Sequence, residues 1–288
     1  MSDTVVGVIG GSGLYQMEGL TDVQEHRIST PFGEPSDLLV SGRLGDARLV
    51  FLPRHGRGHR LLPGEVNYRA NIYALKSLGV TQVISVSAVG SMKEEIVPGH
   101  IVIPHQFYDH TSGLRPSTFF GNGIVGHVQF ADPVCLRLAG LLAGAARTVG
   151  ATVHEGGTYL CMEGPQFSTR AESSIYRSWG VDVIGMTNAT EAKLAREAEL
   201  CYATIALATD YDCWYEGHED VSVEAVVALI QQNVALAKKI IAEAAGRLAG
   251  ERDCGCSRAL EHAIMTDPKL IPEKTRKDLE LIIGKYLK

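Results

Sequence analysis

Short apolar runs rich in β-branched residues alternate along the chain with segments whose apolar positions recur at helical spacing. Several of the short runs are apolar at every position, which is typical of strands that helices cover on both faces of a sheet. The predicted strands are residues 4–9, 47–52, 82–87, 100–103, 158–162, 181–184 and 202–208. The predicted helices are residues 66–78, 133–149, 170–179, 189–197 and 222–248. This alternation predicts an α/β fold.

The longest predicted helix begins at Ser222, a residue type that caps helix N-termini, and continues to about Leu248. The sequence shows no internal repeat or low-complexity segment before about residue 250, so residues 1–249 are expected to form a single domain. Residues 250–288 are expected to form a short helical appendage, which contains the segment CGC at residues 254–256.

The composition excludes several classes of protein and partner. Of 288 residues, 45% are hydrophobic and 21% are charged, as in a soluble globular protein with a substantial core. The formal net charge of −6, without a dense basic stripe, argues against nucleic acid as a partner. The apolar runs are shorter than the roughly 18 residues that cross a membrane, and the first residues lack the basic region of a signal peptide. The six cysteines lie mostly in apolar segments, which suits buried thiols, so a cytoplasmic protein is expected.

Two loops that follow predicted strands are suited to binding an oxyanion. The GGSG segment at residues 10–13 exposes consecutive backbone N–H groups and the hydroxyl of Ser12, although a tight turn without a ligand is the alternative. The second loop carries Arg54, a planar bidentate donor, and His55. Its alternative is a solvated basic loop. A metal site at His55 and His59 is rejected because no third ligand lies nearby at metal-binding spacing.

Two further segments lie near predicted strand ends. Ser87 and Ala88 belong to a run of hydroxyl and small residues, which by itself is a weak indication of a ligand site. In the segment EGPQFSTRAE, Phe167 offers a ring on which a base can stack, and Met186 in the later GMTN segment can lie under a sugar. Both apolar residues can instead fill the core.

Asp210 and Asp212 follow the very apolar segment YATIALA. If the strand continues, two carboxylates two residues apart project to the same side, and their like charges favour retention of a proton by one of them. The pair is therefore a candidate proton donor. A metal-binding pair and a helix cap with a salt bridge are the alternatives.

Taken together, these segments resemble a known family. In their order and spacing, GVIGGSGLY, TPFGEPSD, RHGRGH, VNYRANIYALK, EGPQFSTRAE and ATDYDCW are similar to signatures of the trimeric purine nucleoside phosphorylases. The resemblance extends from about Val5 to about Leu248. It implies a single α/β domain with a central mixed sheet or distorted barrel flanked by helices, assembled as a trimer or a dimer of trimers.

The resemblance also implies a role for individual residues. The phosphate site is expected to consist of Ser12, Arg54, His55, Ser87, Ala88 and Thr187. The base and the sugar are expected to contact Phe167, Ser168, Met186, Asp210 and Asp212. The 5′ end of the nucleoside is expected to contact Val223, Val226, Val227 and a His127 supplied by a neighbouring subunit. Asp210, with Asp212 beside it, is the expected catalytic acid that protonates the purine N7.

The expected reaction is phosphorolysis, in which inorganic phosphate attacks C1′ of a nucleoside whose sugar develops oxocarbenium character. A carboxylate accepts a hydrogen bond from a 6-amino group but not from a 6-oxo group, so Asp210 and Asp212 favour adenine. The apolar valines suit a methylthio group, which makes 5′-methylthioadenosine the expected substrate. A broader phosphorylase acting on adenosine, inosine or methylthioinosine is the alternative. Phosphate is a co-substrate, and neither a metal nor an organic cofactor is expected.

Cys254 and Cys256 are expected to be simple exposed or packed thiols. Closing so short a loop strains a disulfide, and two cysteines alone make a poor zinc site.

Overall fold

Groups of one to four strands are separated by helices along the chain. The computed structural model describes residues 4–11, 13–216, 223–248 and 252–287, except for the side chains of residues 223–228 and 230. The strands are β1 (Val5–Gly10), β2 (Thr21–His26), β3 (Leu39–Leu44), β4 (Ala47–Pro53), β5 (Gln82–Ser91), β6 (Ile101–Ile103), β7 (Gln106–His110), β8 (Val153–Glu155), β9 (Thr158–Met162), β10 (Val183–Gly185) and β11 (Cys201–Asp210). The α-helices are α1 (Tyr68–Ser77), α2 (Leu136–Thr148), α3 (Arg170–Ser178), α4 (Asn188–Glu197), α5 (Val223–Ala245), α6 (Glu273–Asp278) and α7 (Glu280–Ile283). The short 3-10 helices are η1 (Pro63–Glu65), η2 (Gly255–Arg258), η3 (Pro268–Leu270) and η4 (Gly284–Tyr286).

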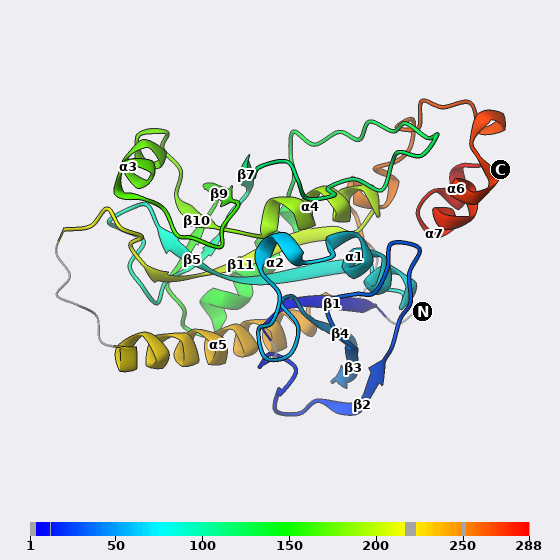
Figure 1. The fold of residues 1–288 in the computed structure, drawn as a ribbon. Helices are drawn as coiled ribbons and strands as arrows, with labels where there is room; N and C mark the ends of the chain where they lie inside the picture. The colour runs from blue at the N-terminus through cyan, green and yellow to red at the C-terminus, as the bar shows by residue number, and fades with distance from the viewer. Residues whose placement is uncertain (1–3, 12, 217–222, 249–251, 288) are drawn as a thin grey trace.

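One mixed sheet of 11 strands forms the centre of the molecule (Figure 1). Its main path runs in the order β2-β3-β4-β1-β5-β10-β9-β7, and β11 pairs with β5 and β6 beside this path. Strands β4, β1, β5 and β11 are mutually parallel, whereas β10 runs antiparallel to β5 and β6 antiparallel to β11. The predicted α/β domain with a central mixed sheet is therefore confirmed.

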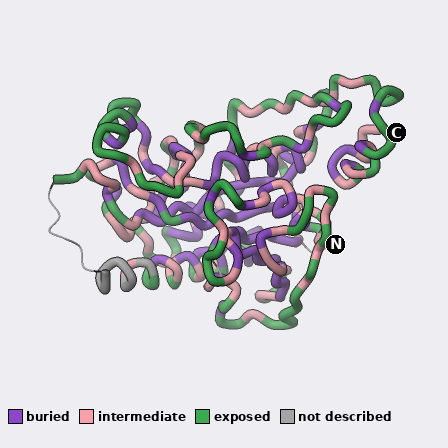
Figure 2. The backbone as a smooth tube through the Cα atoms, in the orientation of Figure 1, coloured by how far each residue is buried: buried purple, intermediate pink, exposed green. Residues whose placement is uncertain are grey.

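Helices cover both faces of the sheet, which explains why its central strands are apolar at every position. Val6 and Val8 of β1 belong to the core cluster that contains α2 and α5, whereas Val5 and Ile9 belong to the cluster with α1 and α4. Figure 2 shows the buried residues concentrated in this central layer, with exposed residues on α3 and the outer loops. None of the helices described, including the long α5, is both long and apolar enough to cross a membrane.

The C-terminal segment packs against the α1 and α4 side of the molecule. Leu260, Ile271 and Ile283 are buried in the same core cluster as α1 and α4. The segment also holds part of the loop between β7 and α2, because the N–H of His127 donates to the Ala263 carbonyl at 2.9 Å. The predicted domain boundary at residue 249 and the predicted N-cap Ser222 lie outside the described residues.

The β7–α2 loop is also fixed to α4 through a buried carboxyl group. Glu197 accepts hydrogen bonds from Thr118 Oγ1 at 2.7 Å and from the Phe119 N–H at 2.6 Å. Desolvation outweighs these bonds and raises the pKa of Glu197 from 4.5 to about 7. The folded state therefore holds a proton that the unfolded state releases, and the stability from this proton is lost as pH rises through about 7.

We expect Glu197→Gln to become more stable relative to the wild type as pH rises, because Gln keeps an acceptor for Phe119 and does not ionise. Between about pH 5 and pH 8 the difference in unfolding free energy should shift toward the variant by about 1–3 kcal/mol. Denaturant unfolding across this range measures the shift. Parallel stability profiles for the two proteins would contradict it.

Candidate active site

Four parallel strands end at one edge of the sheet and bring the predicted oxyanion-binding segments together. Because β1, β4, β5 and β11 run in the same direction, their carboxyl ends lie along a common edge. Gly10 at the end of β1 pairs with Pro53 at the end of β4, and the Arg54 N–H donates to the Gly10 carbonyl at 2.9 Å. Ser87 lies in the carboxyl half of β5, and Asp210 is the last residue of β11.

Arg54 is buried at this edge and paired with Glu191 of α4. Its Nε donates to Glu191 Oε1 at 2.5 Å, and its Nη2 donates to Glu191 Oε2 at 3.2 Å and to Ser85 Oγ at 2.6 Å. Its Nη1 donates to the Val86 carbonyl at 2.9 Å. These contacts use four of the five guanidinium N–H groups, so within the described part of the chain one Nη1 donor is left for a further acceptor.

The Arg54–Glu191 pair keeps a positive charge in a buried position. Desolvation disfavours that charge, but the Glu191 carboxylate more than offsets it and raises the pKa of Arg54. Both carboxylate oxygens of Glu191 accept hydrogen bonds. Each accepts one from Arg54, and Oε2 also accepts from Ser85 Oγ and from the Tyr202 hydroxyl, each at 2.8 Å. The guanidinium is thus held in one orientation by a carboxylate that is only 2% exposed.

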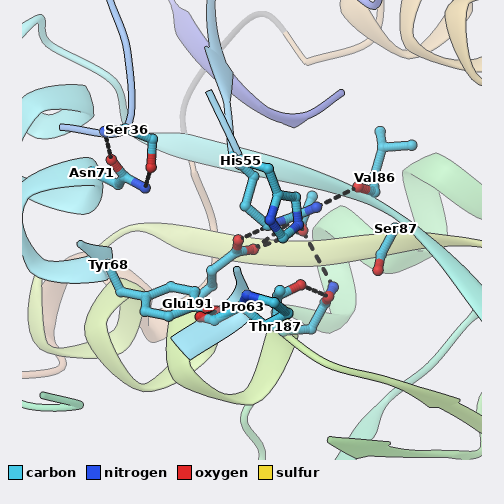
Figure 3. Close-up of polar contacts among 12 residues, drawn as sticks. Ser36, His55, Pro63, Tyr68, Asn71, Val86, Ser87, Thr187 and Glu191 are labelled. Carbon is cyan, nitrogen blue, oxygen red and sulfur yellow. Dashed lines mark hydrogen bonds and ion pairs between the residues drawn. The ribbon is translucent and has the colours of Figure 1, made fainter. Parts of the chain in front are cut away.

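Polar groups from β5 and the start of α4 complete this part of the site. Thr187 is the buried N-cap residue of α4, and its Oγ1 donates to Asn188 Oδ1 at 3.0 Å. The Asn188 amide donates in turn to Ser85 Oγ at 3.2 Å. Figure 3 shows Ser87, Thr187 and His55 around the same region, and Ala88 is exposed to solvent within the otherwise largely buried β5. Hydroxyls, the α4 N-terminus and Arg54 together form an edge suited to an oxyanion.

His55 is held in its neutral form. Desolvation and the adjacent Arg54 charge lower the pKa of His55 from 6.5 to about 4. Its Nδ1 lies 2.8 Å from the Leu61 carbonyl oxygen, which accepts only, so Nδ1 carries the proton and Nε2 has a free lone pair. His55 therefore accepts a hydrogen bond at Nε2, for instance from a protonated phosphate oxygen, rather than contributing a cation.

Asp210 and Asp212 are joined in a turn and do not both lie on an extended strand. Strand β11 ends at Asp210, and Asp212 adopts a left-handed φ of 53° in the following turn. Asp210 Oδ1 accepts from the Asp212 N–H at 2.8 Å, and Oδ2 accepts from Thr209 Oγ1 at 2.7 Å. The strand does not continue, so the condition for the two carboxylates to project to the same side is not met, because the Asp210 side chain itself closes a turn.

Close approach to β5 determines where the Asp210 carboxylate lies. A Cβ atom at Gly90 would be only 3.0 Å from Asp210 Oδ1, so the glycine leaves room for the carboxylate. Gly90 is three residues beyond Ser87 on β5, a spacing of about 10 Å. Asp210 therefore lies a short distance from Ser87, measured along β5.

Arg115 joins the loop after β9 to the loop after β10. Its Nε donates to Glu163 Oε1 at 2.8 Å, and its Nη1 donates to the Met186 carbonyl at 2.5 Å. The Met186 sulfur packs directly against Gly164. A Cβ atom at residue 164 would be 2.5 Å from the sulfur, so the absence of a side chain there leaves room for Met186. These contacts hold Met186 beside the segment that contains Phe167.

The ring of Phe167 is 82% exposed, so the alternative of a core phenylalanine is excluded. Next to it, the Ser168 carbonyl accepts a hydrogen bond from Cys213 Sγ at 3.3 Å, which places this loop against the turn after β11. The predicted base-binding segment and the two acids are therefore neighbours in space, although they are separated by about 40 residues in the chain.

Some predicted site residues are not placed in this site. His127 is exposed on the β7–α2 loop beside the C-terminal segment, and its contribution to a neighbouring subunit stays a prediction. Ser12 and the side chains of Val223, Val226 and Val227 lie outside what the structure describes.

Comparison with known proteins decides the family. The sequence model of the phosphorylase superfamily matches residues 5–245, most of the chain. The chain belongs to the phosphorylase superfamily.

Relatives within the phosphorylase superfamily match the chain over nearly its whole length. S-methyl-5′-thioadenosine phosphorylase of Geobacter sulfurreducens is 67% identical over 99% of this chain and 100% of that protein. A methylthioadenosine phosphorylase from an Antarctic soil metagenomic library has a similar structure, with a TM-score of 0.94 and 46% identity over 98% of this chain and 99% of that chain. Methylthioadenosine phosphorylase from Schistosoma mansoni, solved in complex with adenine, gives a TM-score of 0.83 and 38% identity over 91% and 99%.

In this phosphorylase-superfamily chain, sequence reasoning missed the buried residues that support the site. Glu191, Ser85 and Tyr202 make the contacts that orient Arg54. Glu191 and Tyr202 belong to no recognised loop motif, and Ser85 lies in the same hydroxyl-rich run as Ser87 but was given no role. One signal was available: Glu191 lies three residues after Asn188 and four before Ala195, on one face of an otherwise alanine-rich helix. Burying a carboxylate without a compensating positive charge is costly, so a glutamate on a buried helix face indicates a buried cation beside it.

Proposed function

We propose that this chain catalyses phosphorolysis of 5′-methylthioadenosine to adenine and 5-methylthioribose 1-phosphate. The observation that carries the proposal is the buried Arg54–Glu191 pair at the edge shared by β1, β4 and β5, with Asp210 a short distance along the same edge. The names of the relatives from Geobacter sulfurreducens and the soil metagenome support it.

On this proposal, phosphate binds between the β1 and β4 loops and the start of α4. Arg54 supplies the charged donor, Thr187 and Ser87 supply hydroxyls, and the exposed backbone at Ala88 supplies an N–H. His55 accepts from a protonated phosphate oxygen. Phosphate held here stabilises positive charge that develops on the sugar and is positioned to attack C1′.

The leaving base occupies the region between Asp210 and the β9–α3 loop. The protonated form of Asp210 transfers its proton to N7, so that the C1′–N9 bond breaks with adenine departing as a neutral molecule and Asp210 left as a carboxylate. Asp212 accepts from the 6-amino group. Phe167 and Ser168 line the base, and Met186 lies beneath the ribose. An exposed aromatic ring in the free chain supports this assignment, since base stacking covers apolar area that is otherwise in water.

The remaining features of the proposed enzyme follow from the same reaction. Phosphate is a co-substrate, and the chemistry requires neither a metal nor an organic cofactor. The protein acts in the cytoplasm as a trimer or a dimer of trimers, in which His127 of one subunit reaches the 5′ pocket of the next. Val223, Val226 and Val227 form the apolar wall of that pocket.

Adenine release from 5′-methylthioadenosine, measured with and without inorganic phosphate, tests the proposal. We expect release to fall at least about 100-fold in phosphate-free buffer, because the oxyanion site then lacks the nucleophile. Release at an undiminished rate without phosphate would identify a hydrolytic nucleosidase instead. Tight binding without release would identify a nucleoside-binding protein.

The choice of base is a separate prediction. We expect kcat/KM for 5′-methylthioadenosine to exceed that for 5′-methylthioinosine by about 100-fold or more, because a 6-oxo group places an acceptor against Asp212. Parallel assays on the two nucleosides at saturating phosphate measure the ratio. A ratio near one would support the broader phosphorylase acting on both 6-amino and 6-oxo purines.

A further inference from the structure

Four cysteines from three distant parts of the chain meet at the end of the sheet opposite the active site. Their sulfur atoms all lie within 4.8 Å of one another, and each cysteine is a free thiol. The four are Cys135, Cys201, Cys254 and Cys256. Three of them are buried and Cys254 is half-buried, so the cluster is closed on most sides.

We propose that these four cysteines bind a structural zinc ion. Four thiolates in tetrahedral arrangement are a preferred ligand set for Zn²⁺. With Zn–S bonds of about 2.3 Å, tetrahedral geometry requires sulfurs about 3.8 Å apart. Cys201 Sγ and Cys254 Sγ are 3.4 Å apart, and the largest separation in the cluster is below 4.8 Å. Shifts of less than about 1 Å therefore convert the cluster into a zinc site.

The backbone holds the four ligands in place before any metal binds. Cys135 is the N-cap residue of α2, and its N–H donates to the Tyr202 carbonyl at 2.9 Å, next to Cys201 at the start of β11. The Cys201 N–H donates to the Thr81 carbonyl at 3.0 Å. Two of the four ligands are thus fixed by the sheet and by a helix that begins beside it.

The segment that carries the other two ligands is anchored to the same place. Arg252 Nη1 donates to the carbonyls of Thr81 at 3.0 Å and Glu199 at 3.2 Å. Asp253 forms an ion pair with Arg137 of α2 at 2.9 Å. Preformed placement of this kind lowers the entropic cost of assembling a four-ligand site.

The surroundings offset the charge that the site acquires. Binding of Zn²⁺ displaces the protons of four S–H groups, which gives a centre of net charge −2 and four released protons without any redox change. Arg252 Nη1 is 3.9 Å from Cys201 Sγ, and Cys135 is the N-cap residue at the N-terminus of α2. A cation and a helix N-terminus both stabilise thiolates.

The position of the cluster assigns it a structural role. Cys201 begins β11 and Asp210 ends it, so the cluster and the acid are about 30 Å apart along one strand. The ion would join α2, β11 and the C-terminal segment, whose buried residues already belong to one hydrophobic cluster. Loss of zinc is therefore expected to lower stability, with little effect on the geometry of the active site.

Metal analysis of the full-length protein, isolated in reducing and chelator-free buffer, tests the proposal. We expect about one zinc per chain, and less than about a tenth of that in Cys254→Ser. Cys254→His restores a ligand and is expected to retain zinc, because a three-cysteine, one-histidine set also binds it. Cys161→Ala, which removes a buried cysteine outside the cluster, is the matched control and should retain about one zinc.

Two further measurements make the test independent of activity. Cobalt in place of zinc should give the strong visible bands of tetrahedral thiolate coordination in the wild type and lose them in Cys254→Ser. Removal of zinc by a chelator should lower Tm by about 5–10 °C, and added zinc should restore it. Fully reduced protein that binds neither zinc nor cobalt would overturn the proposal. So would iron in place of zinc, or disulfides among the four cysteines in protein taken directly from cells.

Discussion

Asp210→Asn is expected to lower kcat for 5′-methylthioadenosine phosphorolysis by about 10²–10⁴-fold. Asparagine has nearly the same shape and keeps the Oδ1 that accepts from the Asp212 N–H, so the turn after β11 is preserved. It cannot deliver a proton to N7, and adenine then leaves as an anion. Steady-state kinetics with saturating phosphate measure the loss, and thermal unfolding verifies that the variant remains folded.

Asp212→Asn is the matched control for this prediction. An asparagine at residue 212 still offers a carbonyl to the 6-amino group, so we expect a much smaller loss in kcat together with reduced preference for 6-amino over 6-oxo substrates. Near-normal turnover of Asp210→Asn, or equal losses in the two variants, would remove Asp210 from the role of acid.

Arg54→Met is expected to abolish efficient use of phosphate and to destabilise the fold. The substitution leaves Glu191 buried without its counter-ion, which costs about 3–5 kcal/mol of unfolding free energy. It also removes the charged donor from the oxyanion edge, so kcat/KM for phosphate should fall by about 10²–10³-fold. Denaturant unfolding and phosphate-dependence kinetics measure the two effects separately.

The double variant Arg54→Met/Glu191→Gln distinguishes the two roles of the pair. Glutamine is neutral and still accepts from the Ser85 and Tyr202 hydroxyls, so much of the lost stability should return. The use of phosphate should not return, because the guanidinium is still missing. Recovery of phosphate kinetics along with stability would show that Arg54 acts only as a structural partner of Glu191.

The main strands and helices were predictable because their apolar positions report burial directly. Strands β1, β5 and β11 are covered on both faces, and continuous apolar runs mark such strands. Strand β2 was missed because its residues are largely exposed at the edge of the sheet, so its sequence TDVQEH has no apolar pattern. Strands β3, β7 and β8 were also missed, and β8 has the sequence VHE, with one apolar residue, so it shows no strand pattern.

The candidate site was predictable where a single loop carries a recognisable group of residues. Arg54, Ser87 and Asp210 were each identified by local context and Thr187 only through the family resemblance, and parallel strands bring the segments of the first three to one edge. The pairing of Arg54 with Glu191 was not predictable in this way, since 137 residues separate the partners. The proposed zinc site was not predictable for the same reason. In the sequence Cys254 and Cys256 are an isolated pair, and only the fold brings Cys201 and Cys135 beside them.

By itself the sequence predicted the main strands and helices, loops suited to an oxyanion and the pair Asp210 and Asp212 as a candidate proton donor, because these predictions depend on burial and chemistry within a few neighbouring residues. Only the tertiary structure decided that Glu191 holds Arg54, that Asp210 closes a turn with Asp212, and that four cysteines converge. Each of these depends on the distance between atoms far apart in the chain or on a local turn that competes with strand extension. Such distances are set by the packing of the whole sheet and its helices.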